Sequence, residues 1–153
     1  MKLRIYIDTS VIGGYFDEEF DEDTKEFFKQ VENKKFEIYF SEVNETELSL
    51  APENIRELKY RIPQDCYHYL ELTEEIGELA NEYINSKALG PSSLNDAFHI
   101  AFATVHRLDV LISWNFKHIV NYNKIRLFNS INLKLGYPTI DLRTPREIID
   151  YEE

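Results

Sequence analysis

The sequence predicts an α/β fold with a mainly parallel β-sheet, and three observations lead to this prediction. Short apolar segments rich in β-branched and aromatic residues recur along the chain, and segments with helical spacing of apolar residues separate them. Strands that alternate with helices in this way are typical of a parallel sheet. The 153 residues, 43% of them hydrophobic, suffice for one core, so one domain spanning residues 1–153 is expected.

The predicted strands are short and are followed by polar or turn-forming residues. The first has the sequence LRIYI and ends at Asp8-Thr9-Ser10, after which the Gly13-Gly14 pair predicts a turn. Strands are expected at residues 3–7, 36–40, 66–72, 110–113 and 139–142.

The predicted helices begin at capping residues and end near proline or glycine. Ser41 and Thr73 are expected to cap helices, and Ala51-Pro52 ends one. The segment 95–107 is apolar on most sides, which is typical of a buried helix. Helices are expected at residues 24–33, 42–50, 53–60, 74–86, 95–107 and 121–133, with a last helical turn after Pro145.

Composition limits the possible functions. The net charge of −11 argues against a broad phosphate-binding surface, although a bound metal ion can reverse the local potential of a nuclease site. The acidic segment 17–23 is interpreted as solvated residues that lead into a helix N-terminus. With no apolar run of 18 residues, no signal peptide and Cys66 as the single cysteine, we expect a cytoplasmic protein that does not enter a membrane.

Acidic residues are predicted to converge at one edge of the sheet. Asp8 ends the first strand, Asn115 follows the fourth, and Asp96 begins the helix that runs antiparallel to the fourth strand. The carboxyl ends of parallel strands meet at one edge, where ligands bind. The helix after the second strand starts there too, and it carries Glu42, Glu45 and Glu47. Clustered carboxylates repel unless a cation neutralises them, and Mg²⁺ or Mn²⁺ fits this set of oxygen ligands better than Zn²⁺.

Four segments in this order resemble the PIN domain, and within it the VapC-like toxins of toxin–antitoxin pairs. They are YIDTSVI, SEVNETELSLAP, NDAFHIAFA and VLISWNFKHIVN, and together with their spacing they extend the likeness over nearly the whole chain. The resemblance implies a three-layer α/β/α sandwich with a five-stranded parallel sheet. It also implies a metal-dependent endoribonuclease, an antitoxin protein as partner, and a homodimer.

Matched position by position, the resemblance makes Asp8, Glu47 and Asp96 the metal-binding acids. Glu42 and Glu45 remain alternatives to Glu47. Many family members have a fourth acid where this chain has Asn115. An amide brings no charge, so a one-metal site is favoured.

The expected reaction is hydrolysis of an RNA phosphodiester by a water that the metal activates. Glu47 would ligate the metal or take the proton of the attacking water, and Asn115 would position a water of the metal. Hydroxyl and basic groups near the site are candidates for contact with the phosphate or for orienting Asp8, namely Thr9, Ser10, Ser113 and Lys117.

Several neighbouring residues have two interpretations. His99 lies one helical turn after Asp96 and is either a ligand or a structural histidine, and the structural role is favoured. Trp114 either stacks on a base or anchors the end of the fourth strand. His118 either contacts phosphate or serves a surface or capping role.

Three functions therefore remain open. The first is an active ribonuclease toxin that an antitoxin inhibits by inserting into the acidic cleft. The second is a catalytically weak PIN-like module that acts through protein or RNA binding. The third is another metal-dependent phosphate enzyme, which the absence of a second aspartate two residues after Asp8 disfavours.

Overall fold

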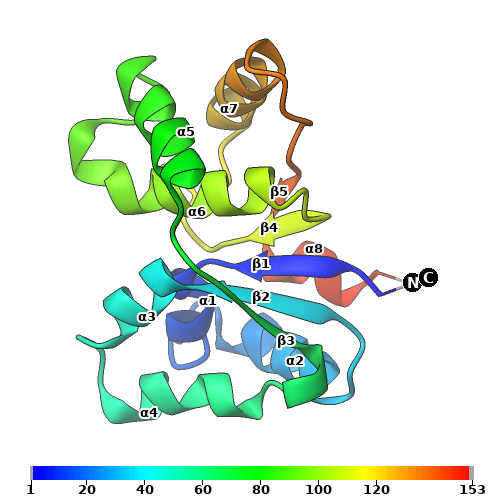
Figure 1. Ribbon diagram of the computed structural model, residues 1–153. Helices are drawn as coiled ribbons and strands as arrows, with labels where there is room; N and C mark the ends of the chain where they lie inside the picture. Colours follow the sequence, from blue (N-terminus) through cyan, green and yellow to red (C-terminus); the bar gives the residue numbers. More distant parts are fainter. Residues whose placement is uncertain (1, 152–153) are drawn as a thin grey trace.

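The computed structural model describes residues 2–151 and has a five-stranded sheet at its centre (Figure 1). The terminal residues 1, 152 and 153 of the predicted domain lie outside the described part. All strand pairings are parallel, and the strand order is β3-β2-β1-β4-β5. The strands are β1 (Arg4–Ile7), β2 (Glu37–Ser41), β3 (Tyr67–Leu70), β4 (Val110–Ile112) and β5 (Leu142–Arg143).

Helices cover both faces of the sheet, so the predicted three-layer α/β/α arrangement is confirmed. Helices α5 (Glu74–Asn85), α6 (Leu94–Val105) and α7 (Tyr122–Lys134) lie above the sheet in Figure 1. Packed on the other face are α1 (Thr9–Gly14), α2 (Asp21–Glu32), α8 (Pro145–Ile149) and the 3₁₀ segment η1 (Glu57–Arg61). The remaining helical segments are α3 (Glu42–Leu48), α4 (Glu53–Arg56), η2 (Gln64–Cys66) and η3 (Pro91–Ser93).

Alternate side chains of the central strand enter two separate hydrophobic clusters. Ile5 and Ile7 pack with α1, α2 and α8, whereas Tyr6 packs with α5 and α6 on the opposite face. Because both faces are covered, the strand is buried at all three positions, which explains why LRIYI lacks a polar alternation.

Two expectations about secondary structure need correction. Residues Thr9–Gly14 form helix α1, and Gly13-Gly14 are its last residues, so the turn begins only at Tyr15. The last strand, expected at residues 139–142, is Leu142–Arg143. It is short because β4 offers only three residues, and two of them pair with β5.

Candidate metal centre

The predicted acids meet at the carboxyl edge of the sheet. Asp8 directly follows β1, and Asn115 lies three residues after β4. Glu47 belongs to α3, which follows β2 without a break, and Asp96 is in the first turn of α6. This is the edge at which parallel sheets bind ligands.

Asp8 is held through one of its two carboxylate oxygens. Its side chain is almost completely buried. Ser10 Oγ donates to Asp8 Oδ2 at 2.6 Å, and Ser113 Oγ donates to the same oxygen at 2.7 Å. These hydroxyls in turn accept from the backbone N–H groups of Trp114 (3.0 Å) and Asn115 (2.9 Å). Folding therefore fixes the carboxylate and leaves Oδ1 as the oxygen that can bind a cation.

Among the three glutamates of α3, Glu47 reaches this site. Its Oε1 accepts from Thr9 Oγ1 at 2.8 Å. Glu45 instead forms an ion pair with Lys59 at 2.7 Å, and Glu42 accepts from the backbone N–H of Leu72 at 2.9 Å. The other two acids are thus engaged elsewhere, because Glu45 and Glu42 lie two and five residues before Glu47 and these spacings place side chains on different faces of a helix.

His99 lies at the centre of the site, where the sequence had favoured a structural role. Its ring is fully buried, and Nε2 lies 2.6 Å from Glu47 Oε1 and 3.4 Å from Asp8 Oδ1. Asp8, Glu47 and His99 place one ligand atom each within 4.8 Å of one another, a spacing that could hold a metal ion. Its position three residues after Asp96 was the one signal in the sequence.

Hydrogen bonding and charge shift the pKa values of Glu47 and His99 in opposite directions. Although burial raises the pKa of Glu47, the hydrogen bond and charge of His99 outweigh it and lower that pKa below its ordinary value. Burial likewise opposes the charged form of His99, but its hydrogen bond to Glu47 and the charge of Asp8 raise its pKa. These shifts favour a protonated His99 imidazole beside an ionised Glu47 carboxylate.

Asp96 and Asn115 are less tightly held. Both are partly exposed, and Asn115 Nδ2 donates to Asp96 Oδ1 at 3.4 Å. Burial raises the pKa of Asp96 to about 6, and the charges of Asp8 and Glu47 act in the same direction. The Asn115 oxygen accepts from the backbone N–H groups of Lys117 (3.2 Å) and His118 (2.9 Å), so the amide nitrogen faces Asp96.

The neighbouring residues divide into buried anchors and exposed groups. Trp114 is 8% exposed, stacks on Phe20 at 4.4 Å and donates from Nε1 to Thr24 Oγ1 at 3.0 Å. This placement supports the anchoring interpretation of Trp114. Lys117 is exposed just beyond Asn115.

The donor set fits a hard divalent cation. Asp8, Glu47 and Asp96 offer carboxylate oxygens from three different elements, the ligand type that Mg²⁺ and Mn²⁺ prefer. Burial and then the negative charges of Asp8 and Glu47 raise the pKa of Asp96, and a cation would neutralise those charges. The arrangement can therefore hold a cation and position a water or phosphate beside it.

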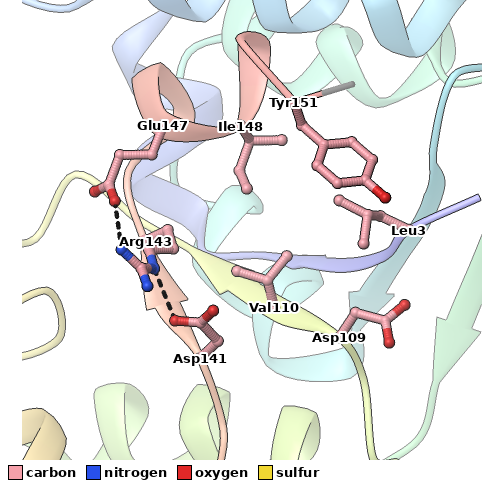
Figure 2. A pocket seen from close by; sticks show the side chains of 8 residues that line it. All are labelled: Leu3, Asp109, Val110, Asp141, Arg143, Glu147, Ile148 and Tyr151. Carbon is pink, nitrogen blue, oxygen red and sulfur yellow. Dashed lines mark hydrogen bonds and ion pairs between the residues drawn. The ribbon is translucent and has the colours of Figure 1, made fainter. Parts of the chain in front are cut away.

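A second hollow lies away from these acids, near the amino ends of β1, β4 and β5 (Figure 2). Its volume is about 230 Å³, and Arg143 in its wall pairs with Asp141 at 2.8 Å and Glu147 at 2.9 Å. The guanidinium is therefore already neutralised. The lining residues are Leu3, Asp109, Val110, Asp141, Arg143, Glu147, Ile148 and Tyr151.

Within residues 2–151, none of the helices combines the length and the apolar character that crossing a membrane requires.

Comparisons with known proteins agree with this architecture. The family model of the PIN domain matches residues 5–117. A toxin–antitoxin complex from Klebsiella pneumoniae contains a similar chain, with 21% identity and a TM-score of 0.54, over 74% of this chain and 88% of that one. VapBC2 from Rickettsia felis, bound to a DNA fragment from its promoter, gives 15% identity and a TM-score of 0.56, over 93% and 98%. A search of curated proteins finds no match.

Proposed function

The chain belongs to the PIN domain family, and on that premise we propose that it is a metal-dependent endoribonuclease. The observation that carries the proposal is the grouping of Asp8, Glu47 and His99 within 4.8 Å at the carboxyl edge of the sheet, with Asp96 near enough for its charge to interact with theirs. Burial, and then the charges of Asp8 and Glu47, raise the pKa of Asp96, so ionising this cluster without a cation is costly. The substrate class is RNA, and Mg²⁺ or Mn²⁺ is the proposed cofactor.

Each residue has a defined part in this proposal. Asp8, through Oδ1, Glu47 and Asp96 would hold the cation. When bound, the cation supplies Lewis-acid activation of a water and neutralises charge that develops on the phosphate oxygens. Glu47 would share in holding the cation or take the proton of the attacking water.

The groups around the acids support positioning more than direct phosphate contact. Thr9 donates to Glu47, and Ser10 and Ser113 donate to Asp8, so these hydroxyls orient the carboxylates. Lys117, exposed beyond Asn115, is the proposed contact for an RNA phosphate. Asn115 would orient Asp96 through its amide nitrogen.

We further propose that the protein is the toxin of a toxin–antitoxin pair and acts in the cytoplasm as a homodimer. Both similar structures described above are complexes of this kind, and VapBC2 resembles the chain over nearly its full length. The partner would be an antitoxin protein that covers the acidic edge and blocks access of RNA.

Incubation of the purified protein with RNA and Mg²⁺ or Mn²⁺ tests the nuclease proposal. We expect cleavage products in wild type, their loss with EDTA, and their loss in Asp8→Asn. Asp150→Asn, which changes an exposed carboxylate at the end of α8, is the matched control and should cut like wild type. Identical RNA profiles for wild type and Asp8→Asn in the presence of metal would reject nuclease activity. Binding of RNA without cleavage would favour the binding module.

A further inference from the structure

Glu47 and His99 belong to a closed ring of six hydrogen-bonded side chains. The ring joins five elements or their ends: β1, α1, the end of β2, α3 and α6. Four of its members are buried, and nothing in the family match assigns Tyr6, Ser41 or Asn44 a role. In order, its contacts are His99–Tyr6 (2.5 Å), Tyr6–Ser41 (2.7 Å), Ser41–Asn44 (3.1 Å), Asn44–Thr9 (2.9 Å), Thr9–Glu47 (2.8 Å) and Glu47–His99 (2.6 Å).

Asn44 determines which group donates at each hydrogen bond of the ring, because the backbone fixes the orientation of its side-chain amide. Its Oδ1 accepts from the backbone N–H of Ser41 at 2.8 Å, and its Nδ2 donates to the carbonyl oxygen of Ile7 at 3.1 Å. Rotating the amide by 180° would place donor against donor and acceptor against acceptor. A fully buried amide does not tolerate two such losses, so its oxygen side and nitrogen side are determined.

On one side of the ring, the donors and acceptors between the Asn44 oxygen and His99 can be assigned in turn. Ser41 Oγ donates its single proton to Asn44 Oδ1 and must therefore accept from the Tyr6 hydroxyl. Tyr6 has then used its proton, so its oxygen accepts from Nδ1 of His99. With Nδ1 engaged by Tyr6, His99 turns Nε2 towards Glu47.

On the other side of the ring, the donors and acceptors between the Asn44 nitrogen and Glu47 can be assigned in the same way. Asn44 Nδ2 donates to Thr9 Oγ1, so the Thr9 proton is free to donate to Glu47 Oε1. Both branches thus deliver a donor to the same carboxylate oxygen. Neither branch contacts Oε2 of Glu47, just as neither serine contacts Oδ1 of Asp8.

We propose that Tyr6 and Asn44 are positioning residues of the metal centre, which orient His99 and Thr9 so that Glu47 presents Oε2 to the cation. The inference rests on the proposed metal-dependent function and deepens it. It also assigns His99 as a hydrogen-bond donor that orients Glu47, because Nδ1 contacts Tyr6 and Nε2 contacts Glu47. Groups that orient a metal ligand from behind commonly control metal affinity.

A pair of tyrosine variants separates this role from simple packing. Tyr83 on α5 is as buried as Tyr6, and its hydroxyl donates to Asn132 of α7 at 2.5 Å. It also contacts Thr104 of α6, and none of its hydrogen bonds involves the acids. We expect Tyr6→Phe and Tyr83→Phe to lower thermal stability by similar amounts. Only Tyr6→Phe should weaken Mn²⁺ binding, by about 10-fold, in a calorimetric titration.

A second comparison uses the other branch of the ring. Thr9→Val, which keeps the side-chain shape but removes the hydroxyl, should also weaken Mn²⁺ binding, and Thr9→Ser should restore it. If folded Tyr6→Phe binds Mn²⁺ as tightly as Tyr83→Phe does, or if Thr9→Val binds it like wild type, the ring has no positioning role.

Cleavage of RNA is measured on the same samples. Wild type that binds Mn²⁺ but leaves RNA intact would overturn the nuclease function alone, because the positioning role is judged from Mn²⁺ binding. A wild type that binds no Mn²⁺ would overturn both.

Discussion

The two halves of the acidic site differ in how firmly the protein holds them. The strand-end half, Asp8, Glu47 and His99, is held by hydrogen bonds of 2.6–2.8 Å from buried or partly buried groups. The helix-end half, Asp96 and Asn115, is partly exposed and joined by one contact of 3.4 Å. Folding alone completes the first half, whereas the second carries charge that burial and its neighbours disfavour. Under the proposed function, a cation would organise the helix-end half when it binds.

The largest effect is expected from removing the donors of the strand-end half. The double variant Ser10→Ala/Ser113→Ala leaves the buried Asp8 carboxylate without either hydroxyl, so the free energy of unfolding should fall by about 3 kcal/mol or more. Chemical denaturation of the metal-free protein measures the change. Ser49→Ala/Ser130→Ala, at exposed positions, is the control. An equal loss in both double variants would contradict a firmly built strand-end half.

A smaller effect is expected where α1 meets the end of β4. A Cβ on Gly14 would lie 2.7 Å from two atoms of the Trp114 ring, so Gly14→Ala should lower the free energy of unfolding by about 2 kcal/mol. Gly13, one residue earlier in the same helix, has open space around it, and Gly13→Ala should be neutral or slightly stabilising. Thermal unfolding of the two variants compares them. Equal stability of the two variants would show that the Trp114 ring does not require a glycine at position 14.

The helix-end half should respond to substitution in the opposite direction. The folded-state pKa of Asp96 is about 6 against an ordinary 3.8, so the folded protein takes up a proton as the pH falls through this window. Asp96 therefore costs stability that grows as the pH rises from about 4 to 6. Without metal at pH 7, Asp96→Asn should raise the free energy of unfolding by about 1 kcal/mol, after allowance for solvent screening of this partly exposed group.

The test of Asp96 is the difference between wild type and Asp96→Asn from pH 4 to 7. Groups that do not interact with Asp96 cancel in that difference, whereas the charges of Asp8, Glu47 and His99 interact with Asp96 and contribute to it. The gain should shrink towards pH 4, and saturating Mn²⁺ should reverse it, because wild type then gains a ligand interaction that the variant lacks. If the difference in the free energy of unfolding does not change with pH, the raised pKa of Asp96 is contradicted.

The smallest effect is expected from restoring a fourth acid. Asn115→Asp places a carboxylate beside Asp96, so metal-free stability should fall by less than about 1 kcal/mol because both groups are partly exposed. Affinity for Mn²⁺, measured by calorimetry, should rise. Unchanged affinity would indicate that position 115 lies outside the reach of the cation. Asn81→Asp, at an exposed position on α5, controls for added charge.

Much of the fold follows from local patterns in the sequence. The strand and helix segments were predicted within a few residues because both faces of the sheet are covered and capping residues such as Ser41 and Thr73 mark helix starts. Helix α1 was missed, since glycine is a poor helix former and Gly14 is required by its contact with Trp114, 100 positions away. Contacts of that range leave no periodic signal.

The candidate site was likewise predictable from the sequence only in part. Topology predicted that Asp8, Asp96 and Asn115 share an edge, and resemblance selected Glu47, which the hydrogen bonds of the three α3 glutamates now single out geometrically. The central place of His99 was not predicted because its partner Tyr6 is 93 positions away and reads as an ordinary strand residue.

The position of β1 between β2 and β4 also determines when the site can form during synthesis. Asp8 and its donor Ser113 are 105 positions apart, and β1 pairs with β4 only after most of the chain exists. At about 5–20 residues per second, a ribosome needs roughly 5–20 s to add that stretch. A nascent chain that ends before β4 therefore carries Asp8 and Glu47 but lacks Ser113, one of the two serines that fix Asp8. The ribosome that makes this protein is not exposed to a finished site until synthesis is nearly over.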